Sequence, residues 1–416
     1  MEMKIPDSLN AYVNKTVPFK FMGRELSFRL SHGLFSSFSV DEGSKLLLKT
    51  IARNVDLSAA ESALDVGCGV GVIGICVNKA APHIATLLQD RDALAVAFAD
   101  MNAEANGCTA VSAACGLAFH GLEDRTFDIV FSNLPAKAGL PVLEGFFRRI
   151  PFHLTEKGTA AVVVIDGIAD FARSTVDSLG FTVTYTEKSG GYTVIHFTAK
   201  PVSSAKGSPS DDLSRYIRAE CRFKSGGITY ELETAFNLPD FDTLGHPIEL
   251  AFDVLSDIKI AGRILFWNPG QGHLPVFISL RHGRTISDVF LAGRDSLELA
   301  IARRNTAKTG IKISGSAAVA GEFCMPGLLG EGSADFICVV PRPIPRVSWQ
   351  MELSAAASLC LRAGGSLFVV ARSTEIHRLL SVIRGFVVRI SRKHLGYRAV
   401  LLTKTDRGAS IPRLPA

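Results

Sequence analysis

The first half of the chain alternates short apolar runs with helical patterns. Residues 19–30 alternate apolar and polar positions around Gly23, which predicts a β-hairpin. Residues 1–18 precede it without such a pattern and are expected to form a mobile lead-in. Residues 42–54 have apolar positions at helical spacing, and Asp41 is placed to cap that helix. The alternation continues to residue 198, with strands closing the series, and it predicts an α/β domain.

A buried strand followed by a glycine-rich turn lies at the centre of this half. Residues 63–66 form an apolar run that carries one acid, Asp65, and glycines follow at 67, 69 and 71. The apolar pattern resumes through residues 73–77, which predicts a parallel strand, a sharp turn and a helix. Glycine is needed where the backbone takes positive φ or where a ligand approaches the main chain closely. Nucleotide-binding turns and purely structural turns share this pattern.

Two further apolar runs end in polar residues. Residues 84–90 end in Asp90, roughly twenty residues after the glycines. In a doubly wound sheet an acid at this point binds ribose hydroxyls, and an ordinary helix cap is the structural alternative. Residues 127–133 end in Asn133, which a leucine and a proline follow. The carboxyl ends of parallel strands share one edge, so these side chains are expected to lie together.

Together, these segments resemble motifs I, II and IV of the class I S-adenosyl-L-methionine (AdoMet) methyltransferases. Residues 33–48, G-L-F-S-S-F-S-V-D-E-G-S-K-L-L-L, resemble the segment before motif I in the methyltransferase small domain family. That family includes ribosomal-RNA guanine-N2 methyltransferases. The resemblance implies a Rossmann-like α/β domain with a mostly parallel, seven-stranded sheet, AdoMet as cofactor and methyl transfer as activity.

The resemblance assigns most site residues to the cofactor. In such enzymes the glycine turn passes under the methionine and ribose, with Asp65 near the ammonium group. Asp90 would accept hydrogen bonds from both ribose hydroxyls. The residues assigned to cofactor binding are Phe35, Asp65, Gly67, Cys68, Gly69, Gly71, Asp90, Arg91 and Cys115.

Two of these assignments have alternatives. Many class I enzymes carry an acid for the adenine amino group where this chain has Cys115 and Gly116. Main-chain groups are therefore expected to bind the adenine. Phe35 and Asp41 are expected either to close over the cofactor or to be a core aromatic residue and a helix cap.

The residues that the resemblance assigns to catalysis are Asn133, Leu134 and Pro135. In the motif N-P-P-[FYW], the asparagine oxygen and the following carbonyl accept the hydrogens of an amino group. Its lone pair then points at the methyl group. This chain keeps the asparagine and one proline, but it has Ala136 where the motif has an aromatic residue that stacks on a planar base. Lys137 is equally consistent with a phosphate contact and with a solvated side chain.

A polar segment rich in Pro, Ser and Gly, 201–215, predicts a linker between a catalytic domain, 1–200, and a second domain, 216–416. The second domain repeats the landmarks of the first. Gly385-Phe386 and Gly396-Tyr397 each lie 205 residues after Gly180-Phe181 and Gly191-Tyr192. The chain is therefore predicted to contain two tandem copies of one fold.

The second copy lacks the residues that would carry chemistry. The predicted replacements are Phe266 for Asp65, Asn268 for Gly67, Gly293 for Asp90 and Val340 for Asn133. Phe266 and Trp267 are expected to put bulk where the methionine end of the cofactor would lie. Residues 216–405 are therefore predicted to be non-catalytic. Ribosomal guanine-N2 enzymes with tandem domains usually have the degenerate copy first, and this chain reverses that order.

Charge is unevenly distributed between the two halves. Residues 1–200 hold 18 Lys+Arg against 21 Asp+Glu, giving −3, whereas residues 201–416 hold 27 against 19, giving +8. Of those 27 cations, 20 are arginines. A basic second domain is typical of a polyanion partner such as RNA, and a solvated arginine-rich surface is the alternative.

Other partners are not indicated. The eight cysteines form no C-x-x-C pair and no zinc-spaced cluster with histidine, so structural thiols and no metal are expected. No apolar run approaches the roughly 18 residues of a membrane helix. The N-terminus has no hydrophobic signal segment, and a cytoplasmic location is expected.

Three functions are consistent with these patterns. The first is an AdoMet-dependent N-methyltransferase for an exocyclic amino group of structured RNA, such as an rRNA guanine, with the second domain binding the RNA. The second is a methyltransferase for a protein side chain or a small metabolite, favoured by the missing stacking aromatic. The third is a protein that binds AdoMet without turnover.

Overall fold

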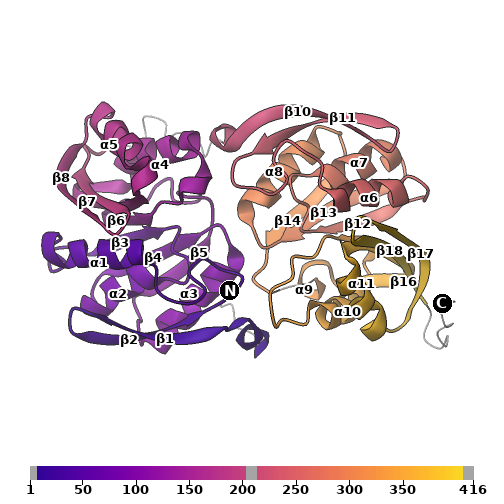
Figure 1. Cartoon of the computed structure of the whole chain (residues 1–416), viewed down its shortest axis with the longest axis horizontal. Helices are drawn as coiled ribbons and strands as arrows, with labels where there is room; N and C mark the ends of the chain where they lie inside the picture. The colour runs from indigo at the N-terminus through magenta and orange to yellow at the C-terminus, as the bar shows by residue number, and fades with distance from the viewer. Residues whose placement is uncertain (1–6, 203–212, 322, 324, 406–416) are drawn as a thin grey trace. The chain divides into compact units, whose positions relative to one another are not determined.

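The computed structural model describes residues 7–202, 213–321, 323 and 325–405. The chain divides into two compact units, Met1–Tyr216 and Ile217–Ala416 (Figure 1). Most of the linker predicted at 201–215 lies outside the described residues, and a short 3₁₀ turn, η5 (Leu213–Tyr216), follows it.

The first unit contains a seven-stranded sheet of order β5-β4-β3-β6-β7-β9-β8. The strands are β3 (Ser62–Val66), β4 (Ala85–Asp90), β5 (Val111–Cys115), β6 (Phe127–Asn133), β7 (Leu154–Ile165), β8 (Thr182–Ser189) and β9 (Tyr192–Thr198). Neighbouring strands from β5 to β7 pair in parallel, and β9 pairs antiparallel with both β7 and β8. The predicted mostly parallel, seven-stranded sheet with a closing antiparallel pair is therefore confirmed.

Helices cover both faces of this sheet. They are α1 (Glu42–Asn54), α2 (Val72–Ala80), α3 (Ala93–Ala105), α4 (Leu140–His153) and α5 (Ala169–Ser178), with 3₁₀ turns η2 (Ala136–Ala138) and η3 (Asp166–Ile168). Leu64 and Leu87 belong to a core cluster that includes buried residues of α4 and α5. Leu88 lies instead against Gly74 of α2, because successive strand residues point to opposite faces.

A separate hairpin, β1 (Lys15–Phe21) and β2 (Arg24–Leu30), is fastened to α3 by a buried asparagine (Figure 1). Asn102 Oδ1 accepts a hydrogen bond from Arg29 N at 2.8 Å, and its Nδ2 donates to Arg29 O and Val70 O. The expectation of a mobile lead-in over residues 1–18 is wrong for residues 15–18, which belong to β1, and for residues 7–12. The latter form a 3₁₀ helix, η1 (Asp7–Tyr12), whose Leu9 and Tyr12 are buried. These two apolar side chains, six and three residues before the hairpin, anchor this segment.

The second unit has a sheet of the same order, β14-β13-β12-β15-β16-β18-β17. Its strands are β12 (Gly262–Trp267), β13 (Ile286–Gly293), β14 (Ile313–Ala318), β15 (Ala334–Val339), β16 (Leu361–Arg372), β17 (Phe386–His394) and β18 (Tyr397–Lys404). Its helices are α6 (His246–Leu255), α7 (His273–His282), α8 (Ser296–Ala307), α9 (Pro326–Leu329), α10 (Trp349–Cys360) and α11 (Ser373–Val382). The predicted tandem repeat of one fold is confirmed.

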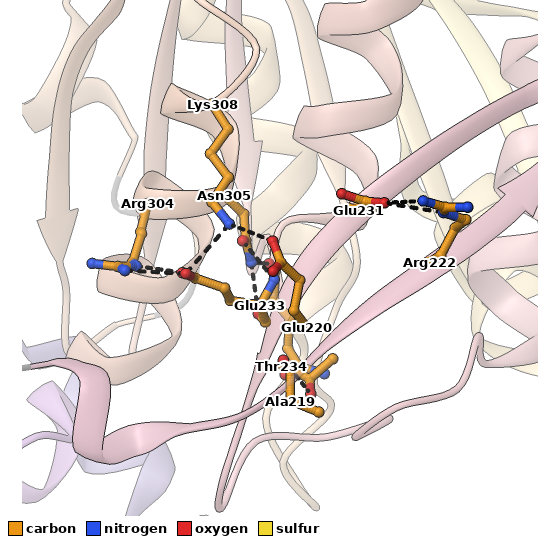
Figure 2. Close-up of polar contacts among 10 residues, drawn as sticks. Ala219, Glu220, Arg222, Glu231, Glu233, Thr234, Arg304, Asn305 and Lys308 are labelled. Atoms are coloured by element: carbon orange, nitrogen blue, oxygen red, sulfur yellow. Dashed lines mark hydrogen bonds and ion pairs between the residues drawn. The ribbon is translucent and has the colours of Figure 1, made fainter.

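The hairpin of the second unit, β10 (Ile217–Ser225) and β11 (Ile228–Ala235), is fastened in the same way. Asn305 of α8 accepts a hydrogen bond from Glu233 N and donates to Glu233 O and Gln271 O, as Asn102 does in the first unit. Figure 2 shows that ion pairs reinforce this junction: Glu233 lies between Arg304 of α8 and Lys308, the residue that follows this helix. An asparagine with the same backbone partners in both units is independent support for a duplication.

Candidate active site

The glycine turn between β3 and α2 contains glycines of two kinds. Gly67, Gly69 and Gly71 all have positive φ, of 73°, 55° and 86°. A Cβ added at Gly67 or Gly69 would meet no atom of the described chain within 4 Å. At Gly71 it would lie 2.7 Å from Ile75 Cδ1 and 3.1 Å from Leu88 Cδ1. The first two glycines therefore leave open space over the turn, and the third allows α2 to pack on the sheet.

Asp65, on β3, is fully buried beneath this turn. Its Oδ2 accepts a hydrogen bond from Gly74 N at 2.9 Å, whereas its Oδ1 has no partner among the described residues. Burial raises the pKa of this carboxyl to about 7, because desolvation outweighs the hydrogen bond from Gly74. A buried carboxylate oxygen without a donor is suited to a cationic ligand group.

Asp90, at the end of β4, holds the turn from the other side. Its Oδ2 accepts a hydrogen bond from Gly69 N at 2.9 Å, and its Oδ1 accepts one from Asp92 N at 2.9 Å. The cap of α3 is Asp92, whose side chain accepts from Leu94 N, so Asp90 is not the helix cap that the structural alternative required. The carboxylate of Asp90 therefore lies against the second glycine of the turn.

The neighbouring strand end continues this edge. Cys115 pairs with Asp90 in the β4–β5 register, and its thiol donates to Arg91 O at 3.6 Å. Gln89 is buried, and its amide donates to Ala118 O and His120 O, which shapes the loop after β5. The role of Gln89 is not predictable from the sequence, since a glutamine inside an apolar run has no distinctive signal.

Cys68 fills the turn without exposing a reactive group. It is buried, and its Sγ donates to Gly69 O at 3.6 Å. Burial, followed by the charges of Asp90 and Asp65, raises the pKa of this thiol well above its ordinary value. The neutral thiol acts as a small packing group.

Asn133, at the end of β6, is held by two residues that precede or begin α1. Its Nδ2 donates to Asp41 Oδ2 at 2.8 Å and to Ser44 Oγ at 3.1 Å. A carboxylate only accepts, so the amide nitrogen must face Asp41. No hydrogen bond reaches Asn133 Oδ1 from the described residues, and this oxygen is left as an acceptor.

Asp41 has a double role at this point. It caps α1 by accepting from Ser44 N at 3.1 Å, which confirms the helix-cap alternative, and its Oδ1 accepts from Tyr192 OH at 3.1 Å. Burial, and next the nearby charge of Asp41, raises the pKa of Tyr192. A Cβ at Gly43 would come within 2.8 Å of the Tyr192 ring, so the D-x-G spacing leaves room for this tyrosine. No sequence motif indicates that Ser44 and Tyr192 belong to this site.

The remaining predicted residues differ in exposure. Leu134 is buried, and its N–H donates to Val163 O at 2.9 Å, whereas Pro135 and Lys137 are exposed. Phe35 is 71% exposed, so it is not the core aromatic residue of the alternative. Its predicted contact with the cofactor remains a prediction.

The same edge of the second unit has lost these features. Asp65 pairs with Phe131 in the first sheet, and Phe266 pairs with Cys338 in the second. Asn133 and Val340 each lie two residues further along, so they occupy equivalent positions in the two units. The registers also make Asp90 and Gly293 equivalent. Val66 pairs with Gln89 in the first sheet and Trp267 pairs with Ala292 in the second, and Asp90 and Gly293 are the next residues along their strands. The predicted replacements therefore occupy equivalent positions.

Polar side chains contact the main chain at the carboxyl edge of the second sheet. Asn268 donates to Val340 O at 3.1 Å, and Gly270 N donates to Glu298, which is buried and ion-paired with Arg342. Phe266 and Trp267 lie in two separate core clusters. Phe266 stands at the position of Asp65, which is equally buried in the first unit, so the expectation that these rings put bulk at the methionine end stays a prediction.

A doubly wound sheet of this strand order, with an open glycine turn, an acid and an asparagine along its carboxyl edge, defines a class I AdoMet-dependent methyltransferase domain. The sequence profile of the methyltransferase small domain family matches residues 25–196. This match to the methyltransferase small domain family lies entirely within the first unit.

Individual relatives agree with this placement. The uncharacterized protein YbxB of Bacillus subtilis is 28% identical over 183 residues, which is 44% of this chain and 90% of that protein. Ribosomal RNA small subunit methyltransferase C of Pseudoalteromonas atlantica is 32% identical over 146 residues, which is 33% of this chain and 40% of that protein. The matched region thus spans less than half of the rRNA methyltransferase.

A solved structure matches both units. The T. Thermophilus 16S rRNA N2 methyltransferase RsmC, in complex with AdoMet and guanosine, aligns with 96% of this chain and 100% of its own, at a TM-score of 0.64 and 18% identity. At this identity the likeness is one of fold. It covers the tandem arrangement, which the family profile does not.

The first unit fits AdoMet on two observations. The turn leaves space over Gly67 and Gly69, and Asp65 keeps an unpaired buried oxygen. Within the described ranges, no group of three or more His, Cys, Asp or Glu side chains is placed to hold a metal ion. No helix in the described parts of the chain is long and apolar enough to cross a membrane.

Proposed function

We propose that this protein is an AdoMet-dependent N-methyltransferase that acts on an exocyclic amino group of structured RNA, such as an rRNA guanine. The observation that carries the proposal is the fixed amide of Asn133. Its nitrogen is held by Asp41 and Ser44, and its oxygen is left to accept a hydrogen from an amino group.

AdoMet carries a methyl group on a positively charged sulfur. An amine lone pair would attack the methyl carbon in line, so that an N–C bond forms as the C–S bond breaks, S-adenosylhomocysteine leaves and the methylated nitrogen releases one proton to solvent. The residues of the first unit position the two partners. Asp65 would meet the ammonium group, Asp90 would accept hydrogen bonds from the ribose hydroxyls, and the main chain over Gly67 and Gly69 would receive the cofactor. Main-chain groups near Arg91 and Cys115 would bind the adenine.

The amino substrate is oriented by Asn133 Oδ1 and the Leu134 carbonyl, with Pro135 stiffening the turn. Accepting both amino hydrogens leaves the nitrogen lone pair directed away from them. Such positioning supplies roughly 7–11 kcal/mol of barrier reduction in favourable cases.

RNA as the substrate is supported by the charge of the second unit. A cavity of about 390 Å³ lies between the start of α11 and the β17–β18 turn. It is lined by Ser373, Thr374, His377, Arg378, Lys393 and Arg398. Arg378 is ion-paired with Glu375 at 2.9 Å, which neutralises its charge. Lys393 and Arg398 are the other lysine and arginine side chains that line the cavity. Hydroxyl and cationic groups of this kind bind phosphate without reading base sequence. The names of the rRNA methyltransferase relatives agree with this substrate.

The activity is tested with tritiated AdoMet and lysate treated either with RNase or with protease. The full-length chain is expected to label an RNase-sensitive product. The variant Asn133→Ala should bind AdoMet normally but lose roughly 100-fold in kcat, as expected for a misplaced nucleophile. Label that only protease removes would contradict an RNA substrate and indicate a protein substrate. AdoMet binding without any labelled product would indicate a protein that binds AdoMet without turnover.

RNA binding is tested separately by filter binding of rRNA fragments across salt concentrations. Lys393→Ala should weaken binding of different RNA sequences equally and reduce the salt slope by about 1. Lys259→Ala, which removes an exposed lysine distant in sequence from this cavity, is the matched control. An unchanged slope for Lys393→Ala would remove this cavity from the RNA interface.

The alternative of a protein side chain or a small metabolite keeps one specific argument. Ala136 cannot stack on a planar base, and amide nitrogens of side chains need no such platform. The fractionated labelling assay decides between the two substrates.

A further inference from the structure

The segment before α1 exposes two aromatic rings beside the candidate active site. Phe35 is 71% exposed and Phe38 is 64% exposed, although both are large apolar side chains. Neighbouring exposed apolar groups of this size mark binding surfaces more often than isolated ones do.

One residue of this segment, Asp41, contacts Asn133. Residues 35–42 line a cavity of about 370 Å³, and one of them, Asp41, accepts the hydrogen bond from the Asn133 amide at 2.8 Å. A ligand that fills this cavity next to Asp41 is therefore adjacent to the amide that orients the amino group.

Phe38 is held in place without being covered. Its ring makes an edge-to-face contact with His32, with centroids 5.4 Å apart, and Asn14 Nδ2 donates to Ser37 O at 2.9 Å. The backbone before Phe38 and one edge of its ring are thus restrained while most of the side chain stays exposed. A restrained aromatic ring loses little conformational freedom when a planar ligand stacks on it.

The first unit needs such a ring. Ala136 stands where the motif would have a stacking aromatic residue, and the amino group of a nucleobase is attached to a flat ring that proteins commonly bind by stacking. We propose that Phe38 supplies this missing stacking surface and binds the base whose amino group Asn133 orients. The inference rests on the proposed RNA function and names the residue that selects a planar substrate.

The second unit offers an internal comparison. Phe241 precedes α6 much as Phe38 precedes α1, but it is 46% exposed and Arg218 lies over its ring at 5.2 Å from the centroid. The equivalent of Asn133 there is Val340. In the copy without the orienting amide, the Arg218 guanidinium covers part of the loop aromatic, whereas the ring in the copy with the amide is more exposed.

The test compares Phe38→Ala with wild type in the full-length chain, using the RNA that the labelling assay identifies. We expect kcat/KM for that RNA to fall roughly 5- to 150-fold, which corresponds to about 1–3 kcal/mol of base–aromatic stacking at about 1.4 kcal/mol per tenfold. AdoMet affinity and Tm should stay at wild-type values, because the side chain is exposed. Phe38→Trp should retain activity, and Phe241→Ala is the matched control that should change nothing.

Three outcomes are informative. A Phe38→Ala chain as active on RNA as wild type overturns this inference alone. Weakened AdoMet binding in Phe38→Ala also overturns it, since the ring would then belong to the cofactor site. A wild-type chain that methylates no RNA removes the proposed function and this inference together.

Discussion

The carboxylate of Asp41 accepts a hydrogen bond from the side-chain amide of Asn133 at 2.8 Å, across 92 residues of sequence. This contact sets which end of the amide is presented to a substrate. Asp41 also caps α1 and accepts from Tyr192, so the start of α1, Asn133 and the start of β9 meet at one carboxylate.

Asp41→Asn separates these roles. Asparagine caps helices as well as aspartate does, but its side chain carries both a donor and an acceptor and no longer fixes the amide of Asn133. We expect kcat to fall roughly 10- to 150-fold, the loss of a hydrogen bond of about 1.5–3 kcal/mol to a charged group, while AdoMet affinity and Tm hold. Asp41→Ala should additionally lose about 1 kcal/mol of stability with the cap. Single-turnover kinetics and thermal melts measure both, and a D41N enzyme with wild-type kcat would contradict the positioning role.

The glycines of the turn should respond differently to alanine. Gly69→Ala places a methyl group in open space over the turn, at a backbone cost of about 1–2 kcal/mol for positive φ. Gly71→Ala adds a clash with Ile75 and Leu88, and overpacking of this kind costs about 1–3 kcal/mol more. We expect G69A to lose at least tenfold in AdoMet affinity with a small change in Tm, and G71A to lose mainly stability.

Gly23→Ala is the control for backbone strain alone. Its φ is 76°, and a Cβ there would meet no described atom within 4 Å, as at Gly69. Titration calorimetry and chemical unfolding of the three variants give both quantities. Equal losses of AdoMet affinity in G69A and G23A would show that the open space over the turn is not the cofactor site.

AdoMet binding should depend on pH through Asp65. Burial raises the pKa of this carboxyl to about 7, so the free protein holds a proton there at lower pH. A bound ammonium group favours the ionised carboxylate, and binding therefore releases a proton. Affinity should rise as the pH rises from about 5.5 towards 7, by at most tenfold per pH unit, and level off above that.

Two comparisons isolate this effect in calorimetric titrations. Asp65→Asn should bind AdoMet more weakly and without the rise. The ligand 5′-methylthioadenosine, which has no ammonium group, should bind wild type with no such pH dependence. A pH profile that is the same for both ligands would place the titrating group elsewhere.

Each chain should bind one AdoMet. The second unit has Gly293 in place of Asp90, and the carboxylate that accepts from its turn glycine is Glu298, which is ion-paired with Arg342. Asp90→Asn should raise the Kd of the single site roughly 10- to 150-fold, because a hydrogen bond to a charged group contributes about 1.5–3 kcal/mol. Gly293→Asp should not create a second site. Calorimetric stoichiometry near two in wild type would refute the non-catalytic assignment.

The sequence by itself determined the repeating architecture and most of its elements. Short apolar runs located β3, β4 and β6, and a capped apolar helix pattern located α1, because strand and helix patterns are local properties of neighbouring residues. The same locality identified the replacements of Asp65 by Phe266 and of Asp90 by Gly293, which the strand registers confirm.

Only the tertiary structure decided which residues meet at the carboxyl edge. Tyr192 reaches Asp41 across 151 residues because β9 lies beside β7 and α1 packs against both strands. The turn glycines look alike in sequence, and only the fold distinguishes their roles. A Cβ at Gly71 would clash with Ile75 and Leu88, whereas a Cβ at Gly69 would meet no described atom within 4 Å. The exposure of Phe38 likewise follows from what the fold places around it. Contacts of this kind depend on strand order and on the distance between elements in space, which no local pattern of residues encodes.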